Sequence, residues 1–475
     1  MTRLRRLVSL LLCLSIAGLG RAQPHAMPIT LIGEGSAQNS IFVHYQDDFQ
    51  DQAKPRFSPE ATADRWQPLR LAAAHPLWLQ LGGEGMQQYA VYARPGDTVY
   101  VRAHPGESPY YTFRGSAHRR FATAEARFYT VLQQHGLGVE FNDAMGLFFN
   151  ARYPFQAKRL GLKRDQRLAL LHRQRDSLLL SPAFARFAEQ QIQVQYLNML
   201  FAPYFDKEHA FKQFPASYTD LIQAATPAAF LANDSLALFL PSYRSAAVSY
   251  VRYLSRDSLD TPAELATQYR QAHTALRGRT RDYVCFFLLK RHLEQHPPAY
   301  GAYYAQFQRE CTTKAYVHYL DSLSARPTAL QQRADLLRTP LLSSTGKTIT
   351  WGQLVAANRG KPSYLDLWAS WCGPCLAEMP ASATLHGSAA GKDLNFVYLS
   401  MDDDKARWLK AITEHGLNRP GTQHYLLDPK STLATFLGAP PIPLYLLLDK
   451  QGRAASLDAP RPGEPRLLEN LAQLR

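Results

Sequence analysis

The segment that most constrains the fold is YLDLWASWCGPCLAEMP, residues 364–380. In it, an apolar run leads directly into two cysteines separated by two residues, Cys372 and Cys375. A short apolar run of this kind is typical of a buried strand, and Pro374 is tolerated in the first turn of a helix. The segment therefore predicts a strand that passes straight into a helix, with Cys372 at the helix N-terminus.

Two thiols at this spacing could form a redox pair, a metal clip or a structural feature. A helix N-terminus presents unpaired N–H groups and a partial positive charge, which stabilise a thiolate. We therefore expect Cys372 to be a nucleophile, and Cys375, one turn later on the same face, to resolve a mixed disulfide. A structural zinc site needs four ligands, so two cysteines alone do not favour a metal site. A peroxiredoxin would need a lone peroxidatic cysteine, which a pair of cysteines does not match. The only histidines nearby lack ligand spacing: His386, His415 and His424.

The last third of the chain, residues 337–475, alternates between strand and helix patterns. Apolar runs such as NFVYLSM and PLYLLLD are separated by segments of helical period such as KARWLKAITEHG, and RLLENLAQL predicts a final helix. This order predicts a central sheet with helices on both faces.

Residues 23–115 have a different texture. Short β-favouring runs at 29–32, 41–45, 77–81 and 98–102 are separated by turn residues. Short strands bounded by Pro-Gly turns predict a small antiparallel β domain.

Residues 116–336 are helical in period, and proline clusters divide them into several helices. Apolar residues recur at helical spacing in two stripes: Phe121, Ala124, Phe128 and Leu132, then Ile192, Tyr196, Met199 and Leu200. Aromatic stripes of this kind are usually core, although they could also line a peptide-binding groove. The expected fold class is thus multidomain α+β, with a C-terminal α/β domain preceded by a small antiparallel β domain and a helical domain.

The first 22 residues have the layout of a secretory signal peptide. Three arginines precede an apolar run at 7–19, which is shorter than the roughly 20 residues that span a bilayer. We expect cleavage near Ala22, with a retained anchor as the alternative, and Cys13 leaves with this segment. An exported chain meets oxidising conditions and little nucleic acid. The net charge of +14 includes four signal arginines, and the remaining basic residues are scattered, so nucleic-acid binding is not expected.

The segment around the cysteines resembles the active site of the thioredoxin superfamily, and within it the exported TlpA/ResA-like thiol-disulfide oxidoreductases. Residues 371–375 match the WCGPC motif, and Pro380 matches the kink proline of the following helix. The exported branch is favoured by the CxxExP pattern that contains Glu378. The segment IPLYLLLDKQG resembles the family's cis-proline segment, which makes Pro443 the expected cis residue. Residues 92–106 resemble an N-terminal β domain found in exported thioredoxin-like proteins of the Bacteroidetes.

The resemblance implies a set of site residues. The implied catalytic residues are Cys372, Cys375, Asp366 and Glu378, and the implied substrate-binding residues are Trp371, Gly373, Pro374, Ile442 and Pro443. Asp366, if buried, should have a raised pKa and could take the resolving thiol's proton, although many exported relatives carry a non-ionisable residue there. Structural alternatives remain open for three residues: an exposed carboxylate for Glu378, a strand-entry proline for Pro443 and packing for Trp371.

The sequence thus predicts an exported, periplasmic or envelope thiol-disulfide oxidoreductase, most simply a protein-disulfide reductase with no cofactor beyond its own cysteine pair. The resemblance implies disulfide-containing exported clients, apocytochrome c among them, and a membrane thiol donor. The alternatives are a binding or scaffold protein with an inactive thioredoxin-like module, and a disulfide oxidase or isomerase. Cys285 and Cys311 could form a disulfide between neighbouring helices or remain two buried thiols.

Overall fold

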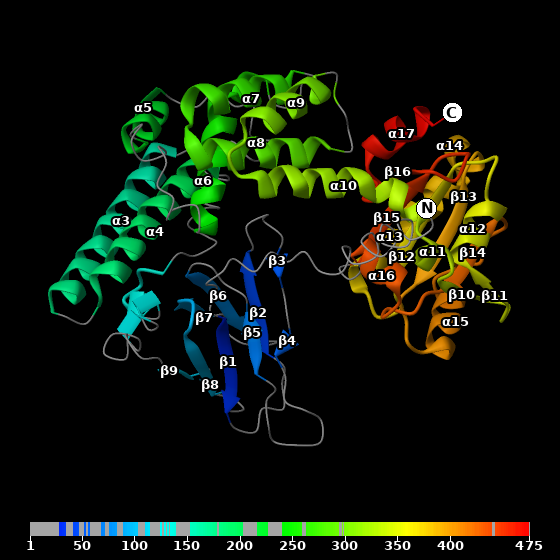
Figure 1. The fold of residues 1–475 in the computed structure, drawn as a ribbon, viewed down its shortest axis with the longest axis horizontal. Coiled ribbons are helices and arrows are strands. Elements are labelled where there is room, and N and C mark those ends of the chain that lie inside the picture. Colours follow the sequence, from blue (N-terminus) through cyan, green and yellow to red (C-terminus); the bar gives the residue numbers. More distant parts are fainter. Residues whose placement is uncertain are drawn as a thin grey trace, which may run out of the picture. The chain divides into compact units, whose positions relative to one another are not determined.

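A computed structural model describes the arrangement of the chain (Figure 1). Its described residues are 28–34, 41–46, 52–53, 56–57, 68–71, 76–82, 89–102, 110–114, 124–125, 128–129, 131–132, 134–138, 153–177, 180–202, 216–226, 240–258, 263–293, 297, 299–438 and 442–474. The expected signal peptide, residues 1–22, lies outside them. The chain separates into two compact units, residues 1–317 and 318–475. The expected domain boundaries at residues 115 and 336 stay predictions.

The N-terminal part of the first unit contains two small sheets. One has the strand order β5-β1-β8-β9; the other has the order β3-β2-β6-β7, with β4 also paired to β2. The strands are β1 (Ile29–Glu34), β2 (Ile41–Gln46), β3 (Gln52–Ala53), β4 (Arg56–Phe57), β5 (Leu69–Leu71), β6 (Leu77–Gly82), β7 (Tyr89–Ala93), β8 (Thr98–Arg102) and β9 (Tyr110–Arg114). They confirm the strands expected from the short apolar runs.

Alternate residues of these strands form one apolar core. Successive side chains of a strand point to opposite faces, so positions two apart share a face. The buried core residues follow that spacing: Ile29 and Leu31, Leu77 and Leu79, Val91 and Ala93, Val99 and Val101. Among the described strands of these two sheets, every pairing is antiparallel except that of β1 with β8, which is parallel. The apolar runs indicate where the short strands lie, but they do not specify the direction in which distant strands pair. The expectation of a purely antiparallel domain is therefore wrong for the pairing of β1 with β8.

The remaining described residues of the first unit are mainly helical, as expected. Its helices are α3 (Tyr153–Asp176), α4 (Pro182–Phe201), α5 (Ala216–Ala225), α6 (Pro241–Leu254), the 3-10 turn η3 (Arg256–Ser258), α7 (Glu264–Ala275), α8 (Gly278–His292) and α9 (Tyr300–Glu310). Helix α4 begins at a capping residue, since the Ser181 hydroxyl accepts the N–H of Phe184 at 3.2 Å. Ile192, Tyr196 and Leu200 of the second stripe are buried, which supports the core interpretation for these positions. Phe121 lies outside the described residues.

The boundary between the two units, at residue 317, falls within helix α10 (Lys314–Gln332). The second unit contains one seven-stranded sheet. Its order is β11-β10-β14-β13-β12-β15-β16. The strands are β10 (Pro340–Ser343), β11 (Thr348–Thr350), β12 (Ser363–Trp368), β13 (Asn395–Ser400), β14 (Thr422–Leu426), β15 (Leu444–Leu448) and β16 (Ala454–Ser456). The helices are α11 (Ala334–Leu337), α12 (Trp351–Ala357), α13 (Gly373–Gly387), α14 (Ala389–Lys392), α15 (Lys405–Glu414), α16 (Thr432–Leu437) and α17 (Pro465–Ala472).

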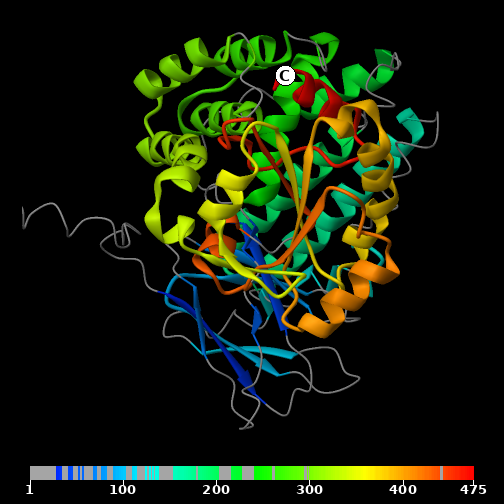
Figure 2. The same ribbon diagram turned by 90° about the vertical axis from the view of Figure 1, so that its right-hand side faces the viewer.

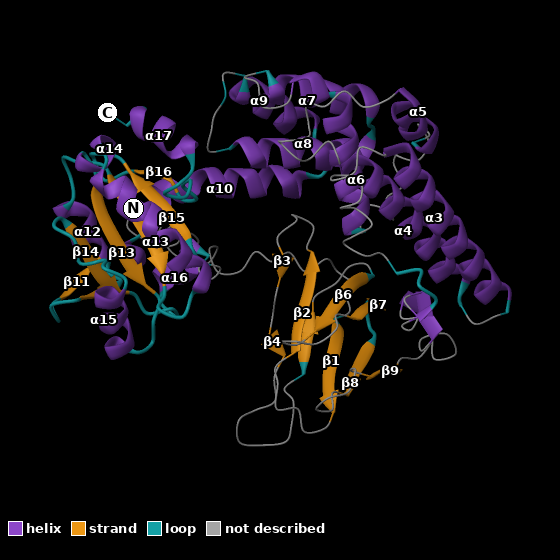
Figure 3. Cartoon of the chain, turned by 180° about the vertical axis from the view of Figure 1, so that it is seen from behind, coloured by secondary structure: helices purple, strands orange, loops and turns teal. Residues whose placement is uncertain are grey.

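Strand β12 is an interior strand of this sheet, between β13 and β15, and helices pack around the sheet (Figures 2 and 3). It pairs in parallel with β13 and antiparallel with β15, and all six of its residues are buried. A strand covered on both faces reads as a continuous apolar run, which explains the pattern that predicted it. The expected multidomain α+β class with a C-terminal thioredoxin-like domain is thereby confirmed. None of the helices in the described part of the chain combines the length and apolar character that a membrane crossing needs.

Candidate active site

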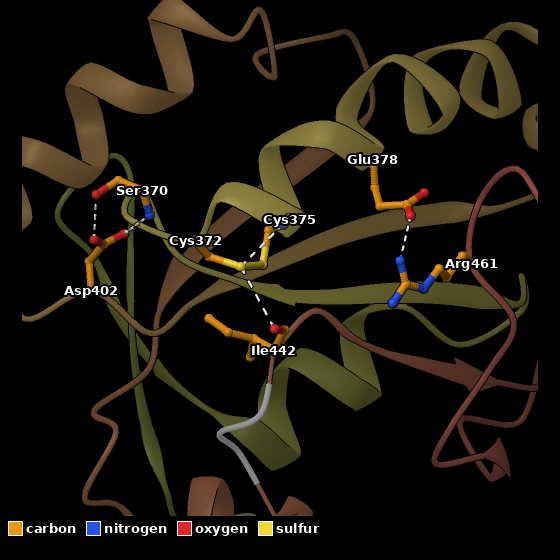
Figure 4. Close-up of a disulfide and its surroundings, with 7 residues drawn as sticks. All are labelled: Ser370, Cys372, Cys375, Glu378, Asp402, Ile442 and Arg461. Carbon is orange, nitrogen blue, oxygen red and sulfur yellow. Dashed lines mark hydrogen bonds and ion pairs between the residues drawn. A yellow bond between two sulfur atoms is a disulfide. The ribbon is translucent and has the colours of Figure 1, made fainter. Parts of the chain in front are cut away.

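The two cysteines lie where β12 gives way to α13, and they form a disulfide (Figure 4). The S–S distance is 2.06 Å and the Cα atoms are 5.2 Å apart. Cys372 is the N-cap of α13, and Gly373 and Pro374 begin the helix. The backbone N–H of Cys375 points at the Cys372 sulfur, with N and Sγ 3.2 Å apart. A sulfur in this position would be stabilised as a thiolate once the disulfide is reduced.

The two cysteines differ in their exposure to solvent. Cys375 is fully buried, whereas Cys372 keeps 5% of its surface exposed. The preceding residue, Trp371, is 56% exposed, which is rare for so large a side chain among the described residues. Of the pair, Cys372 thus reaches the solvent, next to the exposed Trp371.

The segment before β15 comes close to the disulfide. The Ile442–Pro443 peptide bond is cis, as the resemblance implied. The carbonyl oxygen of Ile442 lies 3.8 Å from the Cys372 sulfur (Figure 4). Ile442 is partly buried, and its backbone thus borders the disulfide on the Cys372 side.

Asp366 lies in the middle of β12 and is the most unusual ionisable group of the site. It is 3% exposed, and neither carboxylate oxygen has a hydrogen-bond partner among the described residues. Burial first, and then the charge of Glu378, raises its pKa to about 8. In the sheet register it lies opposite Tyr398 on one side and Tyr445 on the other, so the carboxyl group is flanked by aromatic rings.

Glu378 lies on α13, one turn after Cys375. Its carboxylate accepts a hydrogen bond from the Arg461 guanidinium, with an Nη1–Oε1 distance of 2.8 Å (Figure 4). The Glu378 side chain is 20% exposed and that of Arg461 is 51% exposed. Glu378 is thus neither freely solvated nor directed at the disulfide. It forms an ion pair with Arg461, which lies 83 residues away in the sequence.

A third carboxylate, Asp402, was not identified from the sequence. It is 2% exposed and follows β13, the strand beside β12. It accepts the backbone N–H of Ser370 at 2.9 Å and the Ser370 hydroxyl at 2.6 Å (Figure 4). It also accepts the Ser400 hydroxyl at 2.7 Å. These bonds hold the backbone two residues before Cys372. The sequence did contain a signal for Asp402. An aspartate just beyond the end of a buried parallel strand lies at the same sheet edge as the end of β12.

Cys285 and Cys311, in the first unit, are free thiols buried at 1% and 2% exposure. Burial raises the pKa of both thiols, to about 12 for Cys311. Of the two alternatives, the structure has the buried thiols. Within the described residues, no group of three or more His, Cys, Asp or Glu side chains is arranged to hold a metal ion.

Comparisons with known proteins match the second unit. The Redoxin family matches residues 334–467. The thiol-disulfide oxidoreductase ResA of Bacillus thuringiensis (strain Al Hakam) is 27% identical over 95 residues, which is 20% of this chain and 53% of that protein. ResA of Bacillus subtilis (strain 168) is 22% identical over 129 residues, 27% of this chain and 68% of that protein.

The chain thus spans about half the length of the first of these relatives. A solution structure of a Bacteroides vulgatus protein assigned as a thiol-disulfide oxidoreductase is 34% identical, with 29% of this chain and 85% of that chain covered and a TM-score of 0.26. Within the matched region lie the cysteine pair, Asp366 and the cis Pro443. Residues 334–467 therefore form a redoxin domain with a thioredoxin-like fold, related to the ResA and TlpA thiol-disulfide oxidoreductases.

Proposed function

We propose that this chain is an exported thiol-disulfide oxidoreductase that reduces disulfides of other exported proteins through Cys372 and Cys375. The observation that carries the proposal is the position of the Cys372 sulfur. It lies at the N-terminus of α13, accepts the N–H of Cys375 at 3.2 Å and belongs to the more exposed cysteine of the pair. A thiolate in this environment is stabilised and accessible, which are the two requirements for attack on a client disulfide.

In the first step, the reduced chain meets a client disulfide at the surface beside Trp371. The Cys372 thiolate attacks one client sulfur, a mixed disulfide forms, and the other client sulfur leaves as a thiolate that takes a proton from water. The backbone of Ile442, 3.8 Å from the Cys372 sulfur, can pair with the client main chain in the manner of an added strand. These contacts are sequence-tolerant and suit a range of protein clients.

In the second step, Cys375 attacks the Cys372 sulfur of the mixed disulfide. The bond to the client breaks, the second client thiolate leaves, and the Cys372–Cys375 disulfide remains, so two electrons have passed to the client. Cys375 must first lose its proton in a fully buried position. Asp366, buried without a hydrogen-bond partner and with a pKa of about 8, is suited to take that proton when it is itself ionised, at about pH 8 and above, directly or through water.

The dipeptide between the cysteines favours reduction over oxidation. Gly373-Pro374 is the thioredoxin dipeptide, and thioredoxin has a potential of about −270 mV against about −120 mV for DsbA. In an oxidising compartment the chain would then need electrons from a thiol donor in the membrane. The expected clients are exported proteins with unwanted disulfides, including apocytochrome c. The N-terminal 22 residues support export, since they have the layout of a signal peptide.

The decisive measurement is the reduction potential of the Cys372/Cys375 pair in the full mature chain. The protein is equilibrated in buffers of reduced and oxidised dithiothreitol, and the fraction of disulfide is read by thiol labelling. A Cys372→Ser variant serves as the control. A reversible two-electron couple near about −270 mV supports the reductase. A value near about −120 mV would indicate an oxidase or isomerase, and the lack of a couple would indicate a binding module.

A further inference from the structure

We propose that the solvent-facing side of helix α3 docks the chain on the surface of an anionic lipid bilayer. This side carries an exposed apolar pair, Phe155 and Leu162, with basic residues between and after its two members. The surface belongs to the first unit and is independent of the chemistry of the cysteine pair.

The two sides of α3 differ in what they contact. Ala157 and Leu160 are buried in a core cluster that includes residues of α4, the helix alongside α3 (Figures 1 and 3). Phe155 and Leu162 are instead 63% and 58% exposed. Residues seven positions apart lie on the same face of a helix, about 10 Å apart along its axis. Phe155 and Leu162 therefore form one apolar strip on the side of α3 that faces away from this core.

Large apolar side chains with this exposure are rare in the protein. Across the described part of the chain, four are mostly exposed: Phe155, Leu162, Trp371 and Leu468. Trp371 borders the disulfide, and Leu468 is the single one on α17. An isolated exposed apolar residue is ordinary, whereas two on one face of one helix mark an interaction surface.

The charge of α3 indicates what the strip binds. The helix contains seven Lys and Arg residues and two Asp residues, which leaves a formal charge of +5 with histidine neutral. Each Asp lies beside an arginine: Asp165 is 2.7 Å from Arg164, and Asp176 is 2.9 Å from Arg175. A strongly basic helix attracts an anionic partner.

The basic residues and the apolar strip occupy the same exposed side. Lys158 and Arg159 are both exposed and lie in the turn between Phe155 and Leu162. This combination is typical of helices that lie in a membrane interface, where apolar side chains enter the boundary of head groups and acyl chains while cations attract anionic lipids. A second copy of the chain fits less well, because two strips of the same positive charge repel each other. Docking would also raise the concentration of the chain near a thiol donor in the membrane.

The test measures binding of the full mature chain, with its disulfide intact, to sedimented lipid vesicles. One set of vesicles contains phosphatidylcholine alone, and the other contains phosphatidylcholine with phosphatidylglycerol. The chain should bind the anionic vesicles far more tightly, and binding should weaken as salt is added, because salt screens the attraction. Lys158→Gln should weaken binding about fivefold, the effect of one basic residue close to an anionic surface.

The apolar strip is tested by the double substitution Phe155→Ser and Leu162→Ser. It should weaken binding to anionic vesicles by at least about tenfold, because less apolar area enters the interface. Phe155→Trp should bind at least as tightly as the wild type, since tryptophan favours the membrane interface. This variant tests the same position without removing a large side chain.

The matched controls change similar residues elsewhere. Leu468→Ser removes an exposed leucine of the second unit, and Lys410→Gln removes a lysine whose side chain is 73% exposed. Both should bind as the wild type does. The reduction potential of the cysteine pair should be equal in the double serine variant and the wild type, which separates docking from the redox function.

Equal binding to the two kinds of vesicle would overturn the proposal, and so would unchanged binding of the double serine variant. Weaker binding in Phe155→Trp would also contradict insertion of this side chain into the interface. If the chain binds no vesicles and the double serine substitution instead separates a dimer or a complex with another protein, the strip is a protein interface and the proposal is wrong.

Discussion

Replacing Asp366 by asparagine should remove a pH dependence from the stability of the second unit. The folded chain holds the Asp366 proton up to a pH of about 8, whereas an unfolded aspartate has a pKa of 3.8. Because the folded state binds this proton more tightly, the contribution of Asp366 to the free energy of unfolding is largest below about pH 4 and is lost as the pH rises through about 8. Asparagine is neutral throughout this range, so Asp366→Asn lacks the decline.

The size of the effect follows from the pKa difference. About four pKa units at roughly 1.4 kcal/mol each amount to about 6 kcal/mol of unfolding free energy. Other carboxyl groups contribute equally to both proteins and cancel in the comparison. Above about pH 9 the asparagine variant should therefore be the more stable protein, by several kcal/mol.

The assay measures urea unfolding of the oxidised wild type and the variant at pH 4.5, 7 and 9. Hydrogen–deuterium exchange of peptides from β12 reports the second unit alone. The oxidised form is used because its cysteines do not titrate. Parallel pH dependences in the two proteins would refute the raised pKa of Asp366. In reduced protein at about pH 8, where Asp366 is ionised to a large extent, the same substitution should slow client release by about 10²-fold, because Cys375 loses its proton acceptor.

Three further substitutions test other parts of the site. Cys375→Ser should trap clients as mixed disulfides on Cys372, which are detected as adducts in non-reducing gels and by mass spectrometry. Adducts that persist in a variant without both cysteines would contradict the assignment of Cys372 as the nucleophile. Asp402→Ala should lower the free energy of unfolding of the second unit by about 2 to 4 kcal/mol, measured by urea unfolding, because the N–H and hydroxyl of Ser370 lose their buried acceptor. Trp371→Ala should change the free energy of unfolding by less than about 0.5 kcal/mol, because the side chain is 56% exposed. The same substitution should raise the KM for a protein client several-fold. An unchanged KM would show that Trp371 does not contact the client.

Much of the site could be predicted from the sequence because it is encoded locally. The strand-to-helix passage at Cys372 depends on residues within one turn of each other, so an apolar run followed by Cys-Gly-Pro-Cys predicts it. The cis bond at Pro443 and the burial of Asp366 followed from their places in a motif that resembles a known family. The strand positions of the N-terminal sheets likewise came from local alternation of apolar residues.

Other features depend on which distant segments meet. Neither Arg461 nor Glu378 carries a local sign of the other, since 83 residues separate them and their contact exists only after the segment before α17 packs beside α13. The parallel pairing of β1 with β8 and the bonds from Asp402 to Ser370 have the same origin. By itself, the sequence determined the dithiol, its helix and the fold around it. Tertiary structure alone decided which charges surround the dithiol, because electrostatic environment depends on distance in space and not along the chain.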